Sequence, residues 1–95
     1  MPMITIDELT YKNLAEQLAE QIRESHFFNG RIACSAENYT AELSCSLIIY
    51  RDPQSSKYLR NCPVWWEFYP QTPNGDSEND FDWEMLNQYL DQILK

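Results

Sequence analysis

The most regular segment of this 95-residue chain is YTAELSCSLIIYR, residues 39–51. Apolar and polar side chains alternate along it, and a period of two is typical of a strand with one face in a core. The apolar positions are Tyr39, Ala41, Leu43, Cys45, Leu47 and Ile49. A polar cluster with a proline follows at residues 52–56 and predicts a turn. We therefore expect one long strand over residues 39–51.

Shorter alternating segments on either side predict two further strands. Before it, Ile32, Cys34 and Ala36 alternate with polar residues up to a turn at Glu37-Asn38. After it, residues 63–69 divide into two faces. Val64, Trp66 and Phe68 lie on one face, and Trp65, Glu67 and Tyr69 lie on the other. Because the first set is entirely apolar, we expect it to face the core and Trp65 to lie on the open side.

Helical periodicity flanks the three strands. Residues 6–26 repeat apolar side chains at three- and four-residue steps, with a capping box at Thr5–Glu8 and a stop at Asn29-Gly30. Phe27 and Phe28, just before this stop, are expected to seal the core where the chain turns. Residues 81–94 form a second amphipathic pattern, whose start Asp80 or Asp82 can cap. The apolar stripe of this second helix is Trp83, Leu86, Leu90 and Ile93. Two helices therefore precede and follow the strands.

The resulting order is α-β-β-β-α in a single domain of residues 1–95. Short connections predict an antiparallel meander, and two amphipathic helices can cover one face of it. We expect an α+β two-layer sandwich with a three-stranded antiparallel sheet and both helices on one face. The double-stranded RNA-binding domain has the same order, so the chain resembles that family in topology. Basic residues open the last helix of that family, whereas residues 80–84 here are acidic, which counts against RNA binding.

The charge balance argues against a general affinity for phosphate. Seven basic against fifteen acidic residues give a net charge of −8 and a pI near 4.4. A nucleic-acid or anionic-lipid surface requires a surplus of lysine and arginine. The N-terminus lacks the features of a secretory signal, and the longest apolar run, Leu47–Tyr50, is far shorter than the ~20 residues that span a bilayer. We expect a cytoplasmic protein that does not bind membranes.

Little in the sequence suggests catalysis or a metal. His26 is the single histidine, and no nucleophile or phosphate-loop motif is present. Cys34, Cys45 and Cys62 have no metal-ligand spacing and are expected to be free thiols. The alternating acids of residues 76–84 imitate a calcium loop but lack its glycine and final glutamate, so a solvated loop and helix cap is the better account. We expect no enzyme activity and no cofactor.

An exposed aromatic patch is the strongest functional signal. Open-face positions of adjacent strands, together with the turn between them, give five candidate partner-binding residues. They are Ile48, Tyr50, Tyr58, Trp65 and Tyr69. The sequence thus predicts a small acidic protein-interaction or accessory module that binds a protein partner or forms a homodimer, because a three-stranded sheet also has two free edges. The alternative is that helices or terminal segments cover both faces of the sheet.

A nucleic-acid-directed role is the competing hypothesis. Arg51, Lys57 and Arg60 mix with aromatics in residues 50–60 and could support weak single-strand binding. Alternatively, the acidic surface could imitate a phosphate backbone and inhibit a nucleic-acid enzyme.

Overall fold

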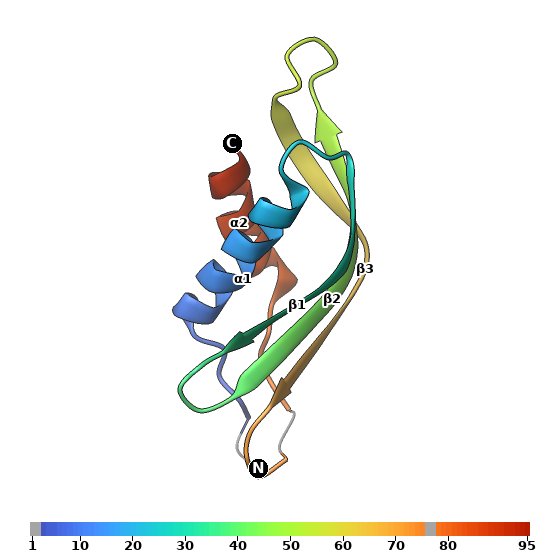
Figure 1. Ribbon diagram of the computed structural model, residues 1–95. Helices are drawn as coiled ribbons and strands as arrows, with labels where there is room; N and C mark the ends of the chain where they lie inside the picture. Colours follow the sequence, from blue (N-terminus) through green and yellow to red (C-terminus); the bar gives the residue numbers. More distant parts are fainter. Residues whose placement is uncertain (1–2, 76–77) are drawn as a thin grey trace.

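The computed structural model describes residues 3–75 and 78–95 and has the expected order of elements (Figure 1). The elements are α1 (Glu8–Ile22), β1 (Phe27–Ser35), β2 (Thr40–Arg51), β3 (Tyr58–Gln71) and α2 (Trp83–Leu94). The strands form one antiparallel sheet in the order β1-β2-β3, and both helices lie on the same side of it. The predicted α+β two-layer sandwich is confirmed.

The core lies between the helices and the sheet. Its fully buried side chains come from α1, β2 and α2, and they occupy the apolar positions predicted from the two periodicities. The largest of them are Leu14, Leu18, Ile22, Leu43, Cys45, Leu47, Leu86 and Leu90. None of the described helices or strands covers the opposite face of the sheet in Figure 1. We call it the open face.

Helix α1 is shorter than the predicted range of 6–26. It ends at Ile22 because Arg23 takes a positive φ of 48° while its N–H still bonds to the carbonyl oxygen of Ala19 at 3.0 Å. The expected stop at Asn29-Gly30 is wrong, since both residues lie inside β1. The predicted capping box at Thr5–Glu8 is also replaced. Asp7 is the N-cap, and its carboxylate accepts from the Thr10 hydroxyl rather than from a backbone N–H.

Strand β3 contains a β-bulge that the alternation did not reveal. Leu47 pairs with Pro63 and Ser46 pairs with Trp65, which leaves Val64 between them without a partner. The expectation that Val64 faces the core is therefore wrong, and its side chain is 58% exposed. Trp66 and Phe68 do lie on the helix side, because they pair with the buried residues Cys45 and Leu43.

The start of α2 is fixed by aromatic and polar contacts. Asp82 caps the helix as predicted, with its Oδ1 accepting from Glu84 N at 3.0 Å. Just before it, the Phe81 ring stacks on Phe68 at 4.0 Å and on Tyr11 at 5.6 Å between centroids. Trp66 packs against the same ring at 5.3 Å. The segment preceding α2 therefore closes the side of the core next to β3.

The N-terminal segment completes this closure. Ile4 forms a parallel bridge with Asn79, and Ile6 N donates to Asp80 Oδ1 at 2.7 Å. The hydroxyl of Tyr11 accepts from Asp82 N at 2.9 Å. These contacts join residues more than 70 positions apart in the sequence. The segment before α1 and the segment before α2 therefore close this side of the core together.

The hairpin of β2 and β3 extends past the helices at one end, and the molecule measures 50 × 20 × 18 Å (Figure 1). Among the residues described, neither helix is long and apolar enough to cross a bilayer.

Candidate functional site

Four apolar side chains gather on the open face near the middle of the sheet. The alternation in β2 directs Ile48 and Tyr50 away from the helices, and the register adds one residue from each outer strand. Phe27 pairs with Ile48, and Trp65 pairs with Ser46. Phe27 is 55% exposed and Trp65 is 45% exposed. We call Phe27, Ile48, Tyr50 and Trp65 the open-face patch.

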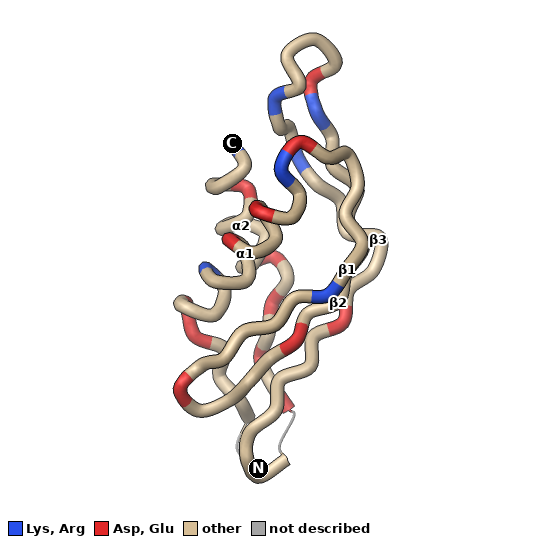
Figure 2. The backbone as a smooth tube through the Cα atoms, in the orientation of Figure 1, with Lys and Arg blue, Asp and Glu red and all other residues tan. Residues whose placement is uncertain are grey.

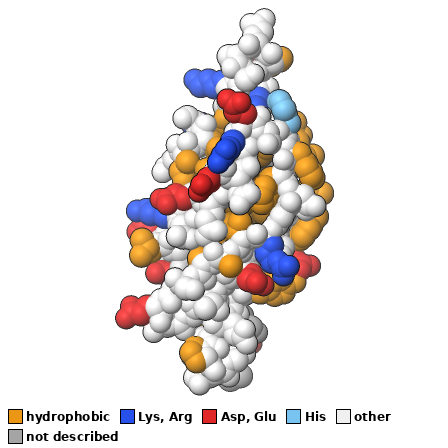
Figure 3. Space-filling model, in the orientation of Figure 1, with side chains coloured by type: hydrophobic (Ala, Val, Ile, Leu, Met, Phe, Trp, Pro, Cys, Tyr) orange, Lys and Arg blue, Asp and Glu red, His pale blue; other side chains and the backbone are white. Residues whose placement is uncertain are grey.

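The space-filling view shows the same distribution. Hydrophobic side chains gather along the margin of the molecule that the sheet forms, on the side away from the helices (Figure 3). A contiguous apolar surface of this kind is unusual on a protein that acts alone, because water contact with it is unfavourable. The open-face patch is therefore a candidate interaction surface.

A cation–π pair borders the patch at the end nearest the β2–β3 turn. Arg60 pairs directly across the strands with Tyr50, and its guanidinium carbon lies 4.2 Å from the centre of the tyrosine ring. The contact places a positive charge beside the apolar surface.

Tyr69 lies on the open face but outside the patch. Glu67 stands between it and Trp65 along β3, and the Tyr69 hydroxyl donates to the Glu67 carboxylate. The structure therefore brings Ile48, Tyr50 and Trp65 together and leaves Tyr69 at a distance.

The assignment of Tyr58 to the interaction surface is wrong. Its side chain is only 4% exposed, because a second register shift places it opposite Arg51 on the helix side of the sheet. The Tyr58 hydroxyl donates to Asp91 Oδ1 and accepts from Asn61 Nδ2 at 2.7 Å. Burial and the adjacent carboxylate raise the pKa of this phenol. Tyr58 therefore joins β3 to α2 and is unavailable to a partner.

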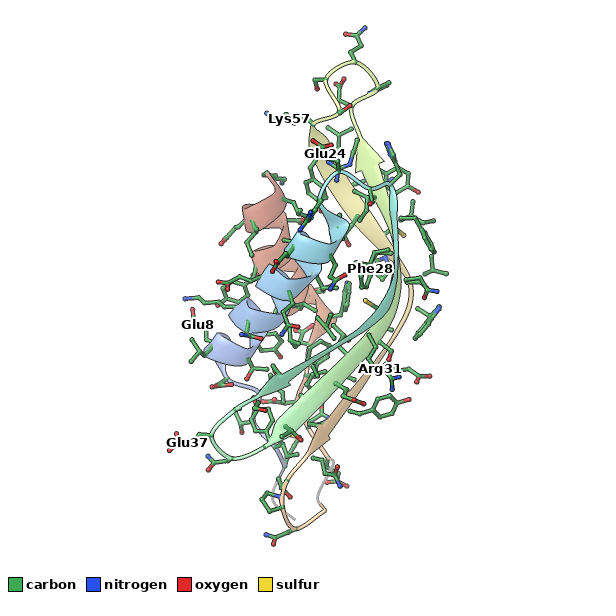
Figure 4. All side chains as sticks on the ribbon, viewed as in Figure 1. Glu8, Glu24, Phe28, Arg31, Glu37 and Lys57 are labelled. Atoms are coloured by element: carbon green, nitrogen blue, oxygen red, sulfur yellow. The ribbon has the colours of Figure 1, made fainter. Side chains whose placement is uncertain are left out.

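Phe27 belongs to the patch, although the sequence pattern pointed to a core seal at the end of the first helix. The sequence pattern that could have identified Phe27 is an alternation in which Phe27, Asn29 and Arg31 occupy every second position. Figure 4 shows that Phe28 points between the sheet and the helices, so its neighbour Phe27 takes the opposite face. The helix-stop residues Asn29-Gly30 obscured this reading.

The basic residues of the 50–60 segment are not equally available. Arg51 donates from its guanidinium to the carbonyl oxygens of Ser25 and Ser56 at 3.1 and 3.3 Å, and to that of Arg23. Arg60 is stacked on Tyr50. Lys57 is exposed next to the turn of the hairpin. The predicted three-cation surface is thus reduced to Lys57 and the stacked Arg60.

The acidic segment before α2 has a structural role where it is described. Asp80 accepts from Ile6 N, and Asp82 caps α2. Asp76, the first acid of the calcium-like alternation, lies outside the described residues.

The three cysteines are free thiols, as expected. Cys45 is buried in the core, and this burial raises the pKa of its thiol to about 12. Cys34 and Cys62 are half-buried, and desolvation also raises the pKa of Cys34. These raised values favour the unreactive thiol over the thiolate at neutral pH.

A hollow of about 840 Å³ lies at the other end of the sheet, away from the open-face patch. Its wall is formed by α1, the ends of all three strands and the loop after β3. The lining residues include Asn13, Gln17, Ser35, Thr40, Glu42 and Gln71. Glu42 is the single carboxylate among them, and it pairs with Arg31 at 3.9 Å. The described part of this wall is polar, and it contains one carboxylate and neither histidine nor lysine.

Comparison with known proteins gives no relative for this chain: no family model, curated protein or solved structure matches it.

Proposed function

We propose that the protein is a small acidic interaction or accessory module without catalytic activity, and that it binds a protein partner through the open-face patch. The observation that carries the proposal is the exposure of Trp65 beside Ile48 and Phe27 on a sheet face without a covering layer. Aromatic side chains of this kind are the usual energetic anchors of protein interfaces.

The charge distribution supports an uncharged contact at this face. Away from the turn, the strands carry two positive and two negative side chains on this face. They are Arg31, Arg60, Glu42 and Glu67. The two helices on the other side carry five acids and one lysine, and Figure 2 shows this acidic distribution on the helix layer. A partner on the open face therefore meets no net charge, and apolar burial dominates the contact.

The side chains that could supply a general base or a nucleophile do not favour a catalytic role. His26 is exposed between α1 and β1, where its carbonyl oxygen accepts from Ile49 N at 2.8 Å. The thiols of Cys34 and Cys45 have raised pKa values, which disfavours the nucleophilic thiolate. The His26 imidazole is not placed as a general base requires, and the two thiols are not placed as a nucleophile requires.

An acidic mimic of nucleic acid is the second candidate. The excess of carboxylates on the helix layer favours it, since a dense negative face can occupy the basic groove of a nucleic-acid enzyme. Direct binding of nucleic acid is less well supported, because Arg51 is already engaged by three carbonyl oxygens.

The test is affinity capture from the source cell with the wild-type protein and two variants. Trp65→Ala removes the anchor of the patch, and Tyr69→Ala removes an exposed aromatic on the same strand outside the patch. We expect Trp65→Ala to lose the captured partner and Tyr69→Ala to retain it. Equal capture by all three proteins contradicts the proposal. Competition of that capture by DNA supports the mimic instead.

A further inference from the structure

The two edges of the sheet differ in whether they can accept another strand. Antiparallel ladders alternate between hydrogen-bonded and non-hydrogen-bonded pairs. Ile49 N donates to the carbonyl oxygen of His26 at 2.8 Å, which continues the β1–β2 ladder and fixes this alternation. It follows that the backbone N–H and C=O groups of Phe27, Asn29 and Arg31 point away from β2, toward the free edge.

The free edge of β3 is protected. Asp52 N donates to the carbonyl oxygen of Lys57 at 2.8 Å, and the same reasoning places Pro63 and Pro70 where the backbone points away from β2. Proline has no N–H to offer there. The register shifts at Val64 and Leu59 interrupt the edge further. Prolines and bulges are the usual means by which edge strands avoid pairing.

The edge of β1 has neither protection. It pairs with β2 over nine residues without a register shift and contains no proline. At one end the carbonyl oxygen of Ala33 accepts from Gln17 Nε2 of α1 at 2.8 Å, so α1 covers the edge there. From Phe27 to Arg31 the strand carries a single charge, the positive one of Arg31, in a chain of net charge −8.

We propose that a second copy of this chain pairs antiparallel with β1, with the two-fold axis at Asn29. Asn29 then faces Asn29 of the second copy, and Phe27 faces Arg31 of the second copy. Both pairs are of the hydrogen-bonded kind because their backbone groups point to the free edge. A two-fold axis repeats each contact, so Phe27 meets Arg31 twice.

The sheet already contains the side-chain pair that this register would form. Tyr50 and Arg60 pair across β2 and β3, on the open face, with the guanidinium 4.2 Å from the ring centre. Phe27 and Arg31 also lie on the open face, and Figure 4 shows Arg31 on the side away from the helices. The second copy is the favoured occupant because the strand is complementary to itself: an aromatic ring meets a guanidinium and no like charges meet.

This inference goes beyond the proposed function, since it uses the edge of β1 and leaves Trp65 on β3 free. Pairing of two copies would form a continuous six-stranded sheet and place both open-face patches on the same side. A partner could then contact two patches at once, which raises its avidity.

The first test is the oligomeric state by sedimentation equilibrium from micromolar to millimolar concentrations. We expect a reversible wild-type dimer. Phe27→Lys places two positive charges opposite each other in each pair and should weaken the dimer by about tenfold. The double variant Phe27→Lys/Arg31→Glu restores opposite charges and should recover the dimer. Trp65→Ala is the control and should dimerise as the wild type does.

The second test uses the wild-type protein alone, so it does not depend on how a variant folds. Amide hydrogen exchange of Asn29 and Arg31 should slow as the protein concentration rises. The amides of Phe28, Gly30 and Ile32 bond within the protomer and should not change.

A monomeric wild type at millimolar concentration overturns the inference, and so does a double variant that fails to dimerise. Loss of partner capture in Trp65→Ala with an intact dimer separates the two proposals, because it shows that Trp65 is needed for the partner and not for pairing of the β1 edges.

Discussion

At the scale of single residues, the two adjacent tryptophans have opposite roles. Trp66 stacks on Phe81 and Trp83 on the helix side yet is 40% exposed, so Trp66→Ala should cost about 1–3 kcal/mol of folding free energy, less than a fully buried aromatic. Trp65→Ala on the open face, where the side chain is 45% exposed, should cost less than Trp66→Ala, about 0.5–1 kcal/mol. Urea unfolding of both variants measures the difference. A larger cost for Trp65→Ala would mean that the open face is covered.

Asp7 links a single carboxylate to the pH dependence of stability. The hydroxyls of Thr10 and Tyr39 donate to it, and these bonds hold the pKa of Asp7 below its usual value. A lowered pKa stabilises the fold above the unfolded value, and this contribution is lost as the pH falls through the folded value, below about pH 4. The stability difference between wild type and Asp7→Asn should therefore shrink from about pH 6 to about pH 3.

Tyr39→Phe is the matched control for this prediction, because it keeps the buried ring and removes one donor to Asp7. Its acid dependence should be weaker than that of the wild type. A constant difference between wild type and Asp7→Asn at both pH values would contradict the account.

At the scale of elements, a polar network joins β3 to the second half of α2. Asn61 Nδ2 donates to Asn87 Oδ1 at 2.6 Å and to the Tyr58 hydroxyl, which in turn donates to Asp91. Tyr58→Phe removes the closer of the two described donors to the Asp91 carboxylate in a partly buried site, the other being Asn61 Nδ2 at 3.4 Å, and should cost about 1–3 kcal/mol. Amide exchange should accelerate in the last turns of α2. Tyr89→Phe, which removes an exposed hydroxyl bonded to Glu8, should cost less than about 0.5 kcal/mol.

The elements also show what could be predicted from sequence. Alternation identified β2 nearly to the residue, because its core side chains come every second position without interruption. In β3 the period of two breaks at the bulges, and a bulge depends on pairing with β2 rather than on local composition. That is why Val64 was assigned to the wrong face, and why Tyr58, which precedes the predicted strand 63–69, was assigned to an exposed turn. Among the candidate site residues, Ile48, Tyr50 and Trp65 lie together, since they come from uninterrupted stretches.

The first helix illustrates a different limit. Asn29-Gly30 carries a strong local preference for ending a helix, yet both residues pair with β2. Tertiary pairing outweighs that preference, and Arg23 takes the positive φ instead. Phe27 was consequently read as part of a helix end and not as an open-face residue.

At the scale of the whole molecule, charge and apolar surface are separated. The two helices carry five acids and one lysine, whereas the open face is balanced in charge and the edge of β1 has no acid. Association through the sheet keeps the acidic layers exposed to solvent. Association through the helices would bring like charges together, which is unfavourable.

This separation predicts how salt affects the dimer. Each copy carries a net charge of −8, so two copies repel at long range even though their β1 edges attract at short range. Raising the ionic strength from about 0.01 M to about 0.15 M shortens the Debye length from about 30 Å to about 8 Å and screens the repulsion. Sedimentation equilibrium should show several-fold tighter association at the higher salt. The double variant Glu16→Gln/Glu20→Gln, with two fewer acids on the exposed side of α1, should depend less on salt. Weaker association at high salt would contradict this account. It would mean that attraction between opposite charges holds the copies together, and the β1 edge, where Arg31 meets Phe27 and no acid is present, supplies no such pair.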